Sequence, residues 1–342
     1  MTKEGASHGA ESTGPPLVVE KRSLLRRAGG MVLRWREASI LLAGVILAAY
    51  FQSTNPAFLS ISNIENLIDY TATTSIIAAG EVMVLVCGEL DLSAGMVYAL
   101  SPFIMHFAMT AGLPAIVAII VSLVAAGFVG LVNGAVTTLL SVPAFVTTLG
   151  TMFLINGLTL TISGGFPVQP NAAAAIAATF GGDPWARLAW SLVIAIVLQF
   201  VLNRTRFGLH TIATGGNLVA AREVGIKVRS IKVRNFALCS ALGGFAGVID
   251  AFRIGSIDPL AGGSEITFAA IAAAVIGGTL LTGGSGTLIG AFIGALVLGI
   301  LKDGFTLLGV SAFTFDMILG AAILATMTVN VHLTQWRERG ET

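Results

Sequence analysis

Long apolar runs with few charges between them set the first limit on how this 342-residue chain can fold. Hydrophobic residues make up 55% of the sequence and charged residues 11%, whereas a soluble domain carries about 25% charged residues. Most of the chain is therefore expected to lie in lipid. The four histidines are scattered without metal-ligand spacing, the two cysteines lie inside apolar runs, and a net charge of +1 gives no indication of nucleic-acid binding.

About ten apolar segments are candidates for membrane-spanning helices, because a helix needs roughly 20 apolar residues to cross the hydrocarbon core. Their expected ranges are 38–55, 64–87, 92–110, 114–140, 144–163, 185–202, 235–252, 266–283, 286–303 and 313–333. Glycine-broken stretches around 88–95 and 277–286 are candidates for re-entrant segments. The sequence thus predicts an all-α integral membrane protein with about ten transmembrane helices, Gly-rich broken segments and both termini cytoplasmic.

The distribution of Lys and Arg predicts the orientation, because short loops rich in these residues stay in the cytoplasm. Sixteen of the nineteen basic residues fall inside: seven in the N-terminal tail, seven in the loop 203–234 and two at the C-terminus. Arg187, Arg253 and Lys302 fall outside. The expected parts are a cytoplasmic tail with an amphipathic basic helix (1–36), a transmembrane domain (37–333) that includes the cytoplasmic loop, and a cytoplasmic C-terminal tail (334–342).

The loop 203–234 is the one long polar interruption, and it has internal order. Small and apolar residues between its glycines, among them Ala213, Leu218, Ala221 and Val224, are spaced for a short helix. A helix on the cytoplasmic side of a membrane protein is a place where a partner can dock. The loop therefore indicates a transport subunit driven by another protein.

Polar residues at membrane depth are the remaining candidates for a functional site, since the chain contains no GxxxxGK[ST] motif. A carboxylate at the bilayer centre costs about 2.5–3.5 kcal/mol on insertion scales, so such groups face a bundle interior or a cavity. Glu81 is either part of a proton relay or solute path, or a structural group. For Asp91, capping of the next helix is the favoured interpretation. The candidate translocation pathway comprises Glu81, Asp91, Ser93, Asn133, Thr148 and Thr151.

Glycines four residues apart predict close helix packing, because that spacing places them on one helix face. The sets are Gly130 with Gly134, Gly243 with Gly247, and Gly286 with Gly290 and Gly294. The run 277–286 is too rich in glycine for a plain helix and predicts a discontinuous segment, of the kind that borders transport pathways.

Four strings occur in series along most of the chain. They are GELDLSAG (88–95), GLVNG (130–134) with VPAFVTTLGTM (142–152), TRFG (205–208) with GGNLVAAREVGI (215–226), and GGT (277–279) with GGSGTLIG (283–290). Together they resemble the permeases of ATP-binding-cassette importers for simple sugars, the ribose, xylose and galactose type. The resemblance implies a multi-pass protein of the inner cell membrane that translocates a simple sugar or related polyol.

The resemblance also implies partners. Two permease copies form the pathway, a separate cytoplasmic ATPase binds ATP and magnesium, and an extracytoplasmic binding protein delivers the sugar, so this chain is no enzyme and holds no cofactor. Membrane lipid is the remaining partner, and no nucleic acid is implied. Outward segments 164–184, 253–265 and 303–312 face the binding protein in this scheme. The residues implied in coupling to the ATPase are Gly215, Gly216, Asn217, Ala220, Ala221, Arg222, Gly225 and Ile226.

The chain departs from the family pattern at a few charged positions. Glu81 and Glu89 stand where the family usually has uncharged residues, and Lys302 with Asp303 replaces a polar uncharged pair. Our hypothesis is that Glu81 lines the path and favours a polyhydroxylated or cationic solute. The alternative function is a proton-coupled secondary transporter that uses Glu81, Glu89 and Asp91. ATP-binding-cassette permeases for branched-chain amino acids or nucleosides are a closer rival, which the GELDLS and TLGTM strings disfavour.

Overall fold

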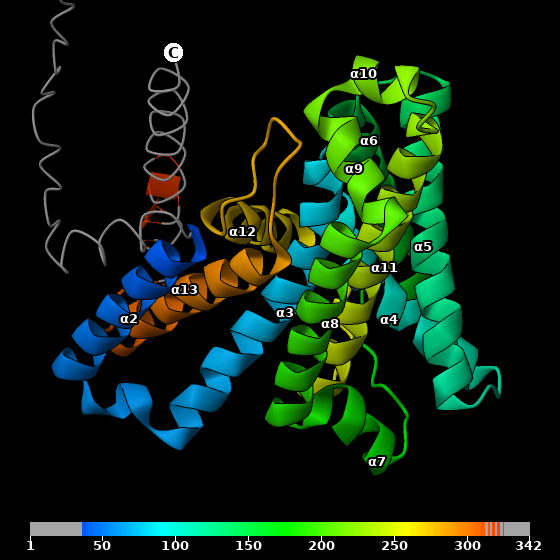
Figure 1. Cartoon of the computed structure of the whole chain (residues 1–342). Helices are drawn as coiled ribbons and strands as arrows, with labels where there is room; N and C mark the ends of the chain where they lie inside the picture. The colour runs from blue at the N-terminus through cyan, green and yellow to red at the C-terminus, as the bar shows by residue number, and fades with distance from the viewer. Residues whose placement is uncertain (1–35, 312–313, 315–316, 319, 322–323, 325–342) are drawn as a thin grey trace, which may run out of the picture.

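The computed structural model describes residues 36–311 and, beyond them, 314, 317–318, 320–321 and 324 (Figure 1). Within these residues the chain is helical, apart from loops and one isolated bridge between Val168 and Ile257. The helices are α2 (Arg36–Thr54), η1 (Pro56–Leu59), α3 (Ile61–Val86), α4 (Ala94–Thr110), α5 (Ala115–Leu139), α6 (Ala144–Ser163), α7 (Ala174–Ala177), η2 (Ala178–Gly182), α8 (Pro184–Arg204), α9 (Arg206–Gly216), α10 (Leu218–Glu223), α11 (Val228–Ile254), α12 (Gly263–Ile276) and α13 (Leu288–Leu307). The predicted all-α class is confirmed.

Six helices of the described chain are long and apolar enough to cross a membrane: α2, α5, α6, α8, α11 and α13. The helix α3 has 26 residues but carries Glu65, Asp69 and Glu81. The helices α4 and α12, with 17 and 14 residues, are only about 25 and 21 Å long at 1.5 Å per residue. The expected breaks are present, because 87–93 and 277–287 lie outside the helices. The predicted basic N-terminal helix, tenth span and C-terminal tail lie mostly or wholly outside the described residues.

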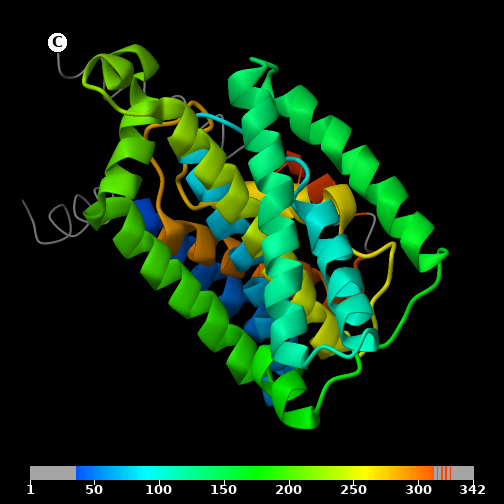
Figure 2. The ribbon, with the colours of Figure 1, turned by 90° about the vertical axis from the view of Figure 1, so that its right-hand side faces the viewer.

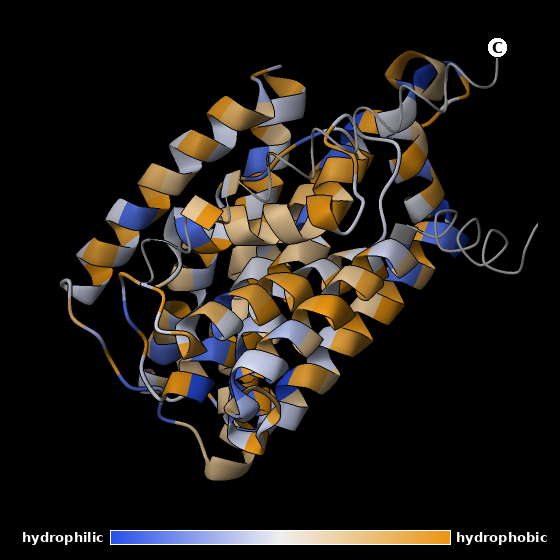
Figure 3. Cartoon of the chain, turned by 90° about the vertical axis from the view of Figure 1, so that its left-hand side faces the viewer, coloured by the Kyte–Doolittle hydropathy of each residue, from blue (hydrophilic) through white to orange (hydrophobic). Residues whose placement is uncertain are grey.

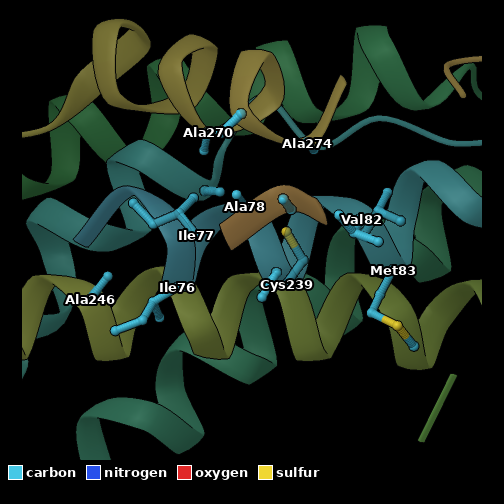
Figure 4. Close-up of a cluster of buried hydrophobic side chains, with 14 of the residues drawn as sticks. Ile76, Ile77, Ala78, Val82, Met83, Cys239, Ala246, Ala270 and Ala274 are labelled. Atoms are coloured by element: carbon cyan, nitrogen blue, oxygen red, sulfur yellow. The ribbon is translucent and has the colours of Figure 1, made fainter. Parts of the chain in front are cut away.

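The helix α3 passes through the middle of the molecule, where it packs against α8, α11, α12 and α13 (Figure 1). Every residue from Thr71 to Cys87 is buried. Figure 4 shows why this stretch is enclosed: Ile76 and Val82 of α3 lie between α11 and the alanine-lined face of α12. A helix that is buried on all sides is the element around which the others are arranged.

Close helix approaches at glycine, expected from the four-residue spacing, are present. The helix α5 meets α11 at Gly134, where an added Cβ would lie 2.6 Å from the Val233 Cα. Gly243 and Gly247 bring α11 against the backbone of α4 in the same way. The long helices consist mainly of apolar residues, as the hydropathy colouring of the ribbon shows (Figure 3). Some of these residues lie on the surface, with Ile46 and Phe153 exposed by 60% and 65%. These surfaces suit contact with lipid.

The short helices and the loops lie at two opposite faces of the molecule. At one face α9 and α10 project beyond the end of α8, and α7 lies at the other (Figures 1 and 2). On the α10 face, the Gly284 N–H donates to the Val86 carbonyl at 2.9 Å and joins α3 to the loop 277–287. On the α7 face, Val168 and Ile257 exchange two backbone hydrogen bonds of 3.0 and 2.7 Å. At each face, these bonds join segments that lie far apart in the sequence.

Candidate functional site

Four of the predicted pathway residues form one buried hydrogen-bond chain. The Ser93 amide and hydroxyl donate to Asp91 Oδ1 at 2.9 and 2.6 Å. Asn133 Nδ2 donates to Ser93 Oγ at 2.9 Å, and Thr151 Oγ1 donates to Asn133 Oδ1 at 2.6 Å. Asp91, Ser93 and Asn133 are fully buried. The chain therefore ties the turn before α4 to α5 and α6.

Asp91 is held from two sides. Besides Ser93, its Oδ2 accepts a hydrogen bond from the Ser240 hydroxyl of α11 at 3.4 Å. The predicted capping of α4 by Asp91 is wrong, because Ser93 is the N-cap residue and α4 has no side-chain cap hydrogen bond. The carboxylate instead orders the turn before the helix through Ser93 and Ser240. Thr148 lies outside this chain, because its hydroxyl donates to the Ala144 carbonyl of its own helix at 2.9 Å.

Glu81 lies at the contact between α3 and α11. It is fully buried, its Oε1 lies 3.7 Å from Cys239 Sγ, and its Oε2 has no hydrogen-bond partner among the described residues. The other charged departures are paired: Glu89 forms an ion pair with Lys232, and Asp303 accepts a hydrogen bond from the Asn63 amide. These two carboxylates therefore connect elements of the fold.

A second group of charged residues, which sequence reasoning missed, lies toward the α7 face. We call it the charged cluster, and its members are Asp69, Arg187, Asp250, Arg253, Glu265 and Lys302. Arg187 pairs with Asp69, while Arg253 pairs with Asp250 and, at 3.5 Å, with Asp69. Lys302 pairs with Glu265 at 3.5 Å. The cluster thus joins α3 to α8 and α11, and α12 to α13.

One sequence signal could have found this cluster. Arg187, Arg253 and Lys302 are the three basic residues that the charge count separates from all others, and each has an acidic partner here. A guanidinium such as that of Arg187, only 3% exposed, requires such a partner, because an unpaired buried charge is strongly destabilising. Isolated cations in or next to apolar segments thus point to carboxylates on neighbouring helices.

A cavity of about 370 Å³ lies between α3, α11, α12 and α13 beside the charged cluster. Its walls include Tyr70 and Thr73 of α3 as well as five members of the cluster, all except Arg187. None of the six predicted pathway residues lines this cavity. Polar groups that could meet a solute are therefore concentrated closer to the α7 face than predicted.

The predicted coupling residues lie in and around two short helices at the opposite face. Asn217 ends α9 and begins α10, and its Oδ1 accepts from the Val219 and Ala220 amides at 3.1 and 3.0 Å. Ala221 is buried, whereas Arg222 is exposed and Val219 is 65% exposed. Gly225 and Ile226 follow in the link to α11, where Gly225 has a φ of +83°. The cap fixes the bend that presents α10 outward.

Glycines attach this unit to the transmembrane body. We call the contact the glycine junction, formed by Gly88, Gly215, Gly216, Gly283 and Gly284. A Cβ on Gly215 would overlap the Val86 carbonyl oxygen and lie 2.8 Å from the Gly284 nitrogen. The end of α3, the end of α9 and the loop 277–287 therefore touch backbone to backbone. Gly215 and Gly216 therefore contact the transmembrane body, whereas Arg222 is exposed.

Known proteins share this sequence over most of its length. Residues 63–327 match the family model described as branched-chain amino acid transport system / permease component. The chain is 37% identical over 308 residues to the xylose/arabinose import permease of Sulfolobus acidocaldarius, covering 88% of this chain and 86% of that protein. It is 35% identical to the ribose import permease of Escherichia coli K12, covering 84% and 91%. It is 32% identical to the autoinducer 2 import system permease of Photorhabdus luminescens, covering 85% and 88%. No solved structure matches the chain.

Proposed function

The chain belongs to the permease components of ATP-binding-cassette importers, and we propose that it carries a simple sugar or related polyol across the inner cell membrane. The relatives named above import xylose and arabinose, ribose, or autoinducer 2. The family description names branched-chain amino acids instead. The sugar assignment is supported by these relatives together with the GELDLSAG and TLGTM strings. The chain is a transport component, and ATP hydrolysis belongs to a separate subunit.

The observation that carries this proposal is the projecting unit of α9 and α10. Seven of the nineteen basic residues lie in the loop 203–234 that contains it, which supports a cytoplasmic position. Val219 and Val224 are 65% and 76% exposed, so α10 offers apolar side chains beside Arg222. A short helix of this kind suits a groove on a partner ATPase. The glycine junction then passes its displacement directly to α3.

The opposite face is proposed to receive the extracytoplasmic binding protein. The loops after α6 and after α11 lie together there, joined by the bridge between Val168 and Ile257. Phe166 and Leu260, one on each loop, are both 74% exposed. Large apolar side chains on a solvent-facing loop are typical of interaction surfaces. This placement accords with both termini in the cytoplasm and with about ten spans.

The pathway itself is proposed to form between two copies of the permease. In this protomer α3 is buried from Thr71 to Cys87. We propose that Asp91, Ser93, Asn133 and Thr151 hold α4, α5 and α6 together beside the route. Glu81 and Thr148 are the remaining candidates for contact with solute in another state of the transport cycle.

The proton-coupled alternative has less support. Both Asp91 oxygens accept hydrogen bonds, and Glu89 is paired with Lys232. A relay would need these groups to exchange protons across the membrane. Membership of an import-permease family, together with a projecting helix that a secondary transporter would leave unused, favours the importer.

Docking at α10 can be tested with two charge reversals on the same face. We expect Arg222→Glu to abolish co-purification with the partner ATPase and the stimulation of ATP hydrolysis by the permease. Arg204→Glu, which changes an exposed residue at the end of α8, is the matched control and keeps both. The importer proposal fails if wild-type permease neither binds nor stimulates the ATPase, and the docking site is wrong if the two variants behave alike.

A further inference from the structure

The cavity beside the charged cluster has the size and lining of a ligand site. At about 370 Å³ it falls in the range of about 300–1,000 Å³ that small-molecule sites occupy. It is walled by the early part of α3, the last turns of α11, the first turns of α12 and the end of α13. Beyond Thr74, α3 is enclosed by neighbouring helices as far as Cys87. A solute in this cavity would therefore contact α3 next to the start of its enclosed stretch.

The charges in the walls compensate one another. Asp69, Asp250 and Glu265 supply three carboxylates, and Arg253 and Lys302 supply two cations. The third balancing cation, Arg187, contacts Asp69. A charged solute would compete with these ion pairs, and the competition is costly at the pairs of the buried Arg187 and Asp250 side chains, which are 4% and 11% exposed. A neutral solute with several hydroxyls can donate to the carboxylates and accept from the cations while the pairs persist.

A buried hydroxyl without a partner is a second, independent indication. Thr73 lines the cavity, is only 5% exposed, and its Oγ1 makes no hydrogen bond among the described residues. Thr73 is one of eight buried Ser and Thr hydroxyls without a partner among the described residues, and of these eight it is the one that lines the cavity, where a ligand could supply the missing group. Thr71, two residues earlier, also has an unpartnered hydroxyl, but it lies toward Gly299 of α13 and does not line the cavity. The two threonines are a natural pair for comparison.

The ring of Tyr70 completes the lining. It lines the cavity on α3, and Lys302 Nζ lies 4.7 Å from its ring centroid. An aromatic face beside charged hydrogen-bonding groups suits a molecule with C–H groups on one side and hydroxyls around its edge.

We propose that this cavity is a binding site for a neutral polyhydroxylated solute in the size range of a pentose or hexose, with Thr73 hydrogen-bonded to a solute hydroxyl. The assignment rests on the proposed function for its biological meaning. It is distinct from the six predicted pathway residues, and it places solute recognition in the permease itself, at the end of α3 nearest the binding-protein face.

Direct binding tests the site without the ATPase. The full-length permease in lipid nanodiscs is titrated with D-xylose and with D-ribose, and binding is followed by saturation-transfer difference NMR. We expect wild type to bind at least one of the two neutral sugars. Thr73→Val weakens that binding by about fivefold, the effect of one lost hydrogen bond, whereas Thr71→Val leaves it unchanged. D-gluconate and D-glucosamine, which carry charge, bind more weakly than the neutral sugars.

A second variant guards against a folding defect. Ala269, 4% exposed, also lines the cavity, and Ala269→Leu is expected to reduce sugar binding by filling part of the space while the permease remains monodisperse on size exclusion. Equal binding by the Thr71 and Thr73 variants, equal binding of gluconate, or no binding to wild type would overturn the site. ATP-driven uptake tests the importer separately: uptake without binding here sinks the site alone, and binding without uptake sinks the proposed function alone.

Discussion

The two ends of α3 are held to their neighbours in opposite ways. At the Val86 end, the glycine junction brings three backbones together with no side chain between them. At the Asp69 end, long charged side chains of the charged cluster form the contacts. Backbone packing at Gly215 admits no added atom and transmits displacement directly. Ion-paired side chains can rotate and share their partners with a solute. The first end thus suits mechanical connection, and the second suits recognition.

The largest effect is expected from removing an ion-pair partner in the charged cluster at the Asp69 end of α3. Asp69→Ala leaves the guanidinium of Arg187 buried without its carboxylate, which costs about 3 kcal/mol of folding stability. The purified variant should unfold at a clearly lower temperature in a fluorescence melt. Asp258→Ala, at an exposed loop position where the carboxylate accepts only from the Leu260 amide, is the control and should cost about 1 kcal/mol or less. Equal melting temperatures for the two variants would show that the cluster does not hold α3.

The next largest effect is expected at the glycine junction, where two neighbouring glycines should respond differently to substitution by alanine. A methyl group on Gly215 overlaps the Val86 carbonyl, whereas one on Gly216 meets the Gly284 Cα at an ordinary 3.8 Å. Gly215→Ala should therefore destabilise the junction by about 2 kcal/mol and uncouple ATP hydrolysis from uptake. Gly216→Ala should be close to wild type. The measurement is the amount of sugar taken up per ATP hydrolysed by each variant in proteoliposomes. The same ratio for both variants would rule out a tight contact at Gly215.

A smaller effect is expected midway between the ends. Asn133→Ala removes the link between Ser93 and Thr151 and leaves both hydroxyls short of a partner, at a cost of about 1.5 kcal/mol. Thr148→Val removes a hydroxyl that bonds only within its own helix, so its cost should be smaller. Thermal unfolding of both variants ranks them. The reverse order would mean that the hydrogen-bond chain does not connect α4, α5 and α6.

The smallest effect is expected at the bend between α9 and α10. Asn217→Ala removes the cap and costs about 1 kcal/mol, loosening α10 without unfolding the transmembrane body. Affinity for the ATPase should fall modestly, and Asn217→Asp, which keeps the accepting oxygen, should restore it. A failure of the aspartate to restore affinity would indicate that Asn217 contacts the ATPase itself.

The sequence predicts the helices well, because each apolar run is local information. The glycine-rich breaks before α4 and α13 were predicted for the same reason. The number of spans stays a prediction: α4 and α12 are apolar, but at 17 and 14 residues they are shorter than the helices that are long enough to cross a membrane. In the described chain six helices have the length and composition to cross a membrane, and the expectation of about ten spans remains a proposal.

The candidate site was only partly predictable. Asp91 and Ser93, which are hydrogen-bonded, lie two residues apart in the sequence and belong to the GELDLSAG string. Arg187 and Asp69 are 118 residues apart, and nothing local pairs them. Likewise, the unpartnered hydroxyl of Thr73 differs from that of Thr71 only through the helices that surround each. The sequence therefore predicted the polar residues that belong to a local motif, and it did not predict the charged cluster, whose members come from five helices.

Solute accumulation is the most direct test of the central claim. The permease and its ATPase are reconstituted in proteoliposomes with the ATPase and ATP inside, and the binding protein and labelled D-xylose or D-ribose are added outside. We predict that internal ATP drives accumulation of sugar against its gradient, unaffected by a proton uncoupler and lost in Arg222→Glu. Sugar movement driven by a pH gradient without ATP, and abolished by Glu81→Gln, would contradict the account and establish the proton-coupled alternative.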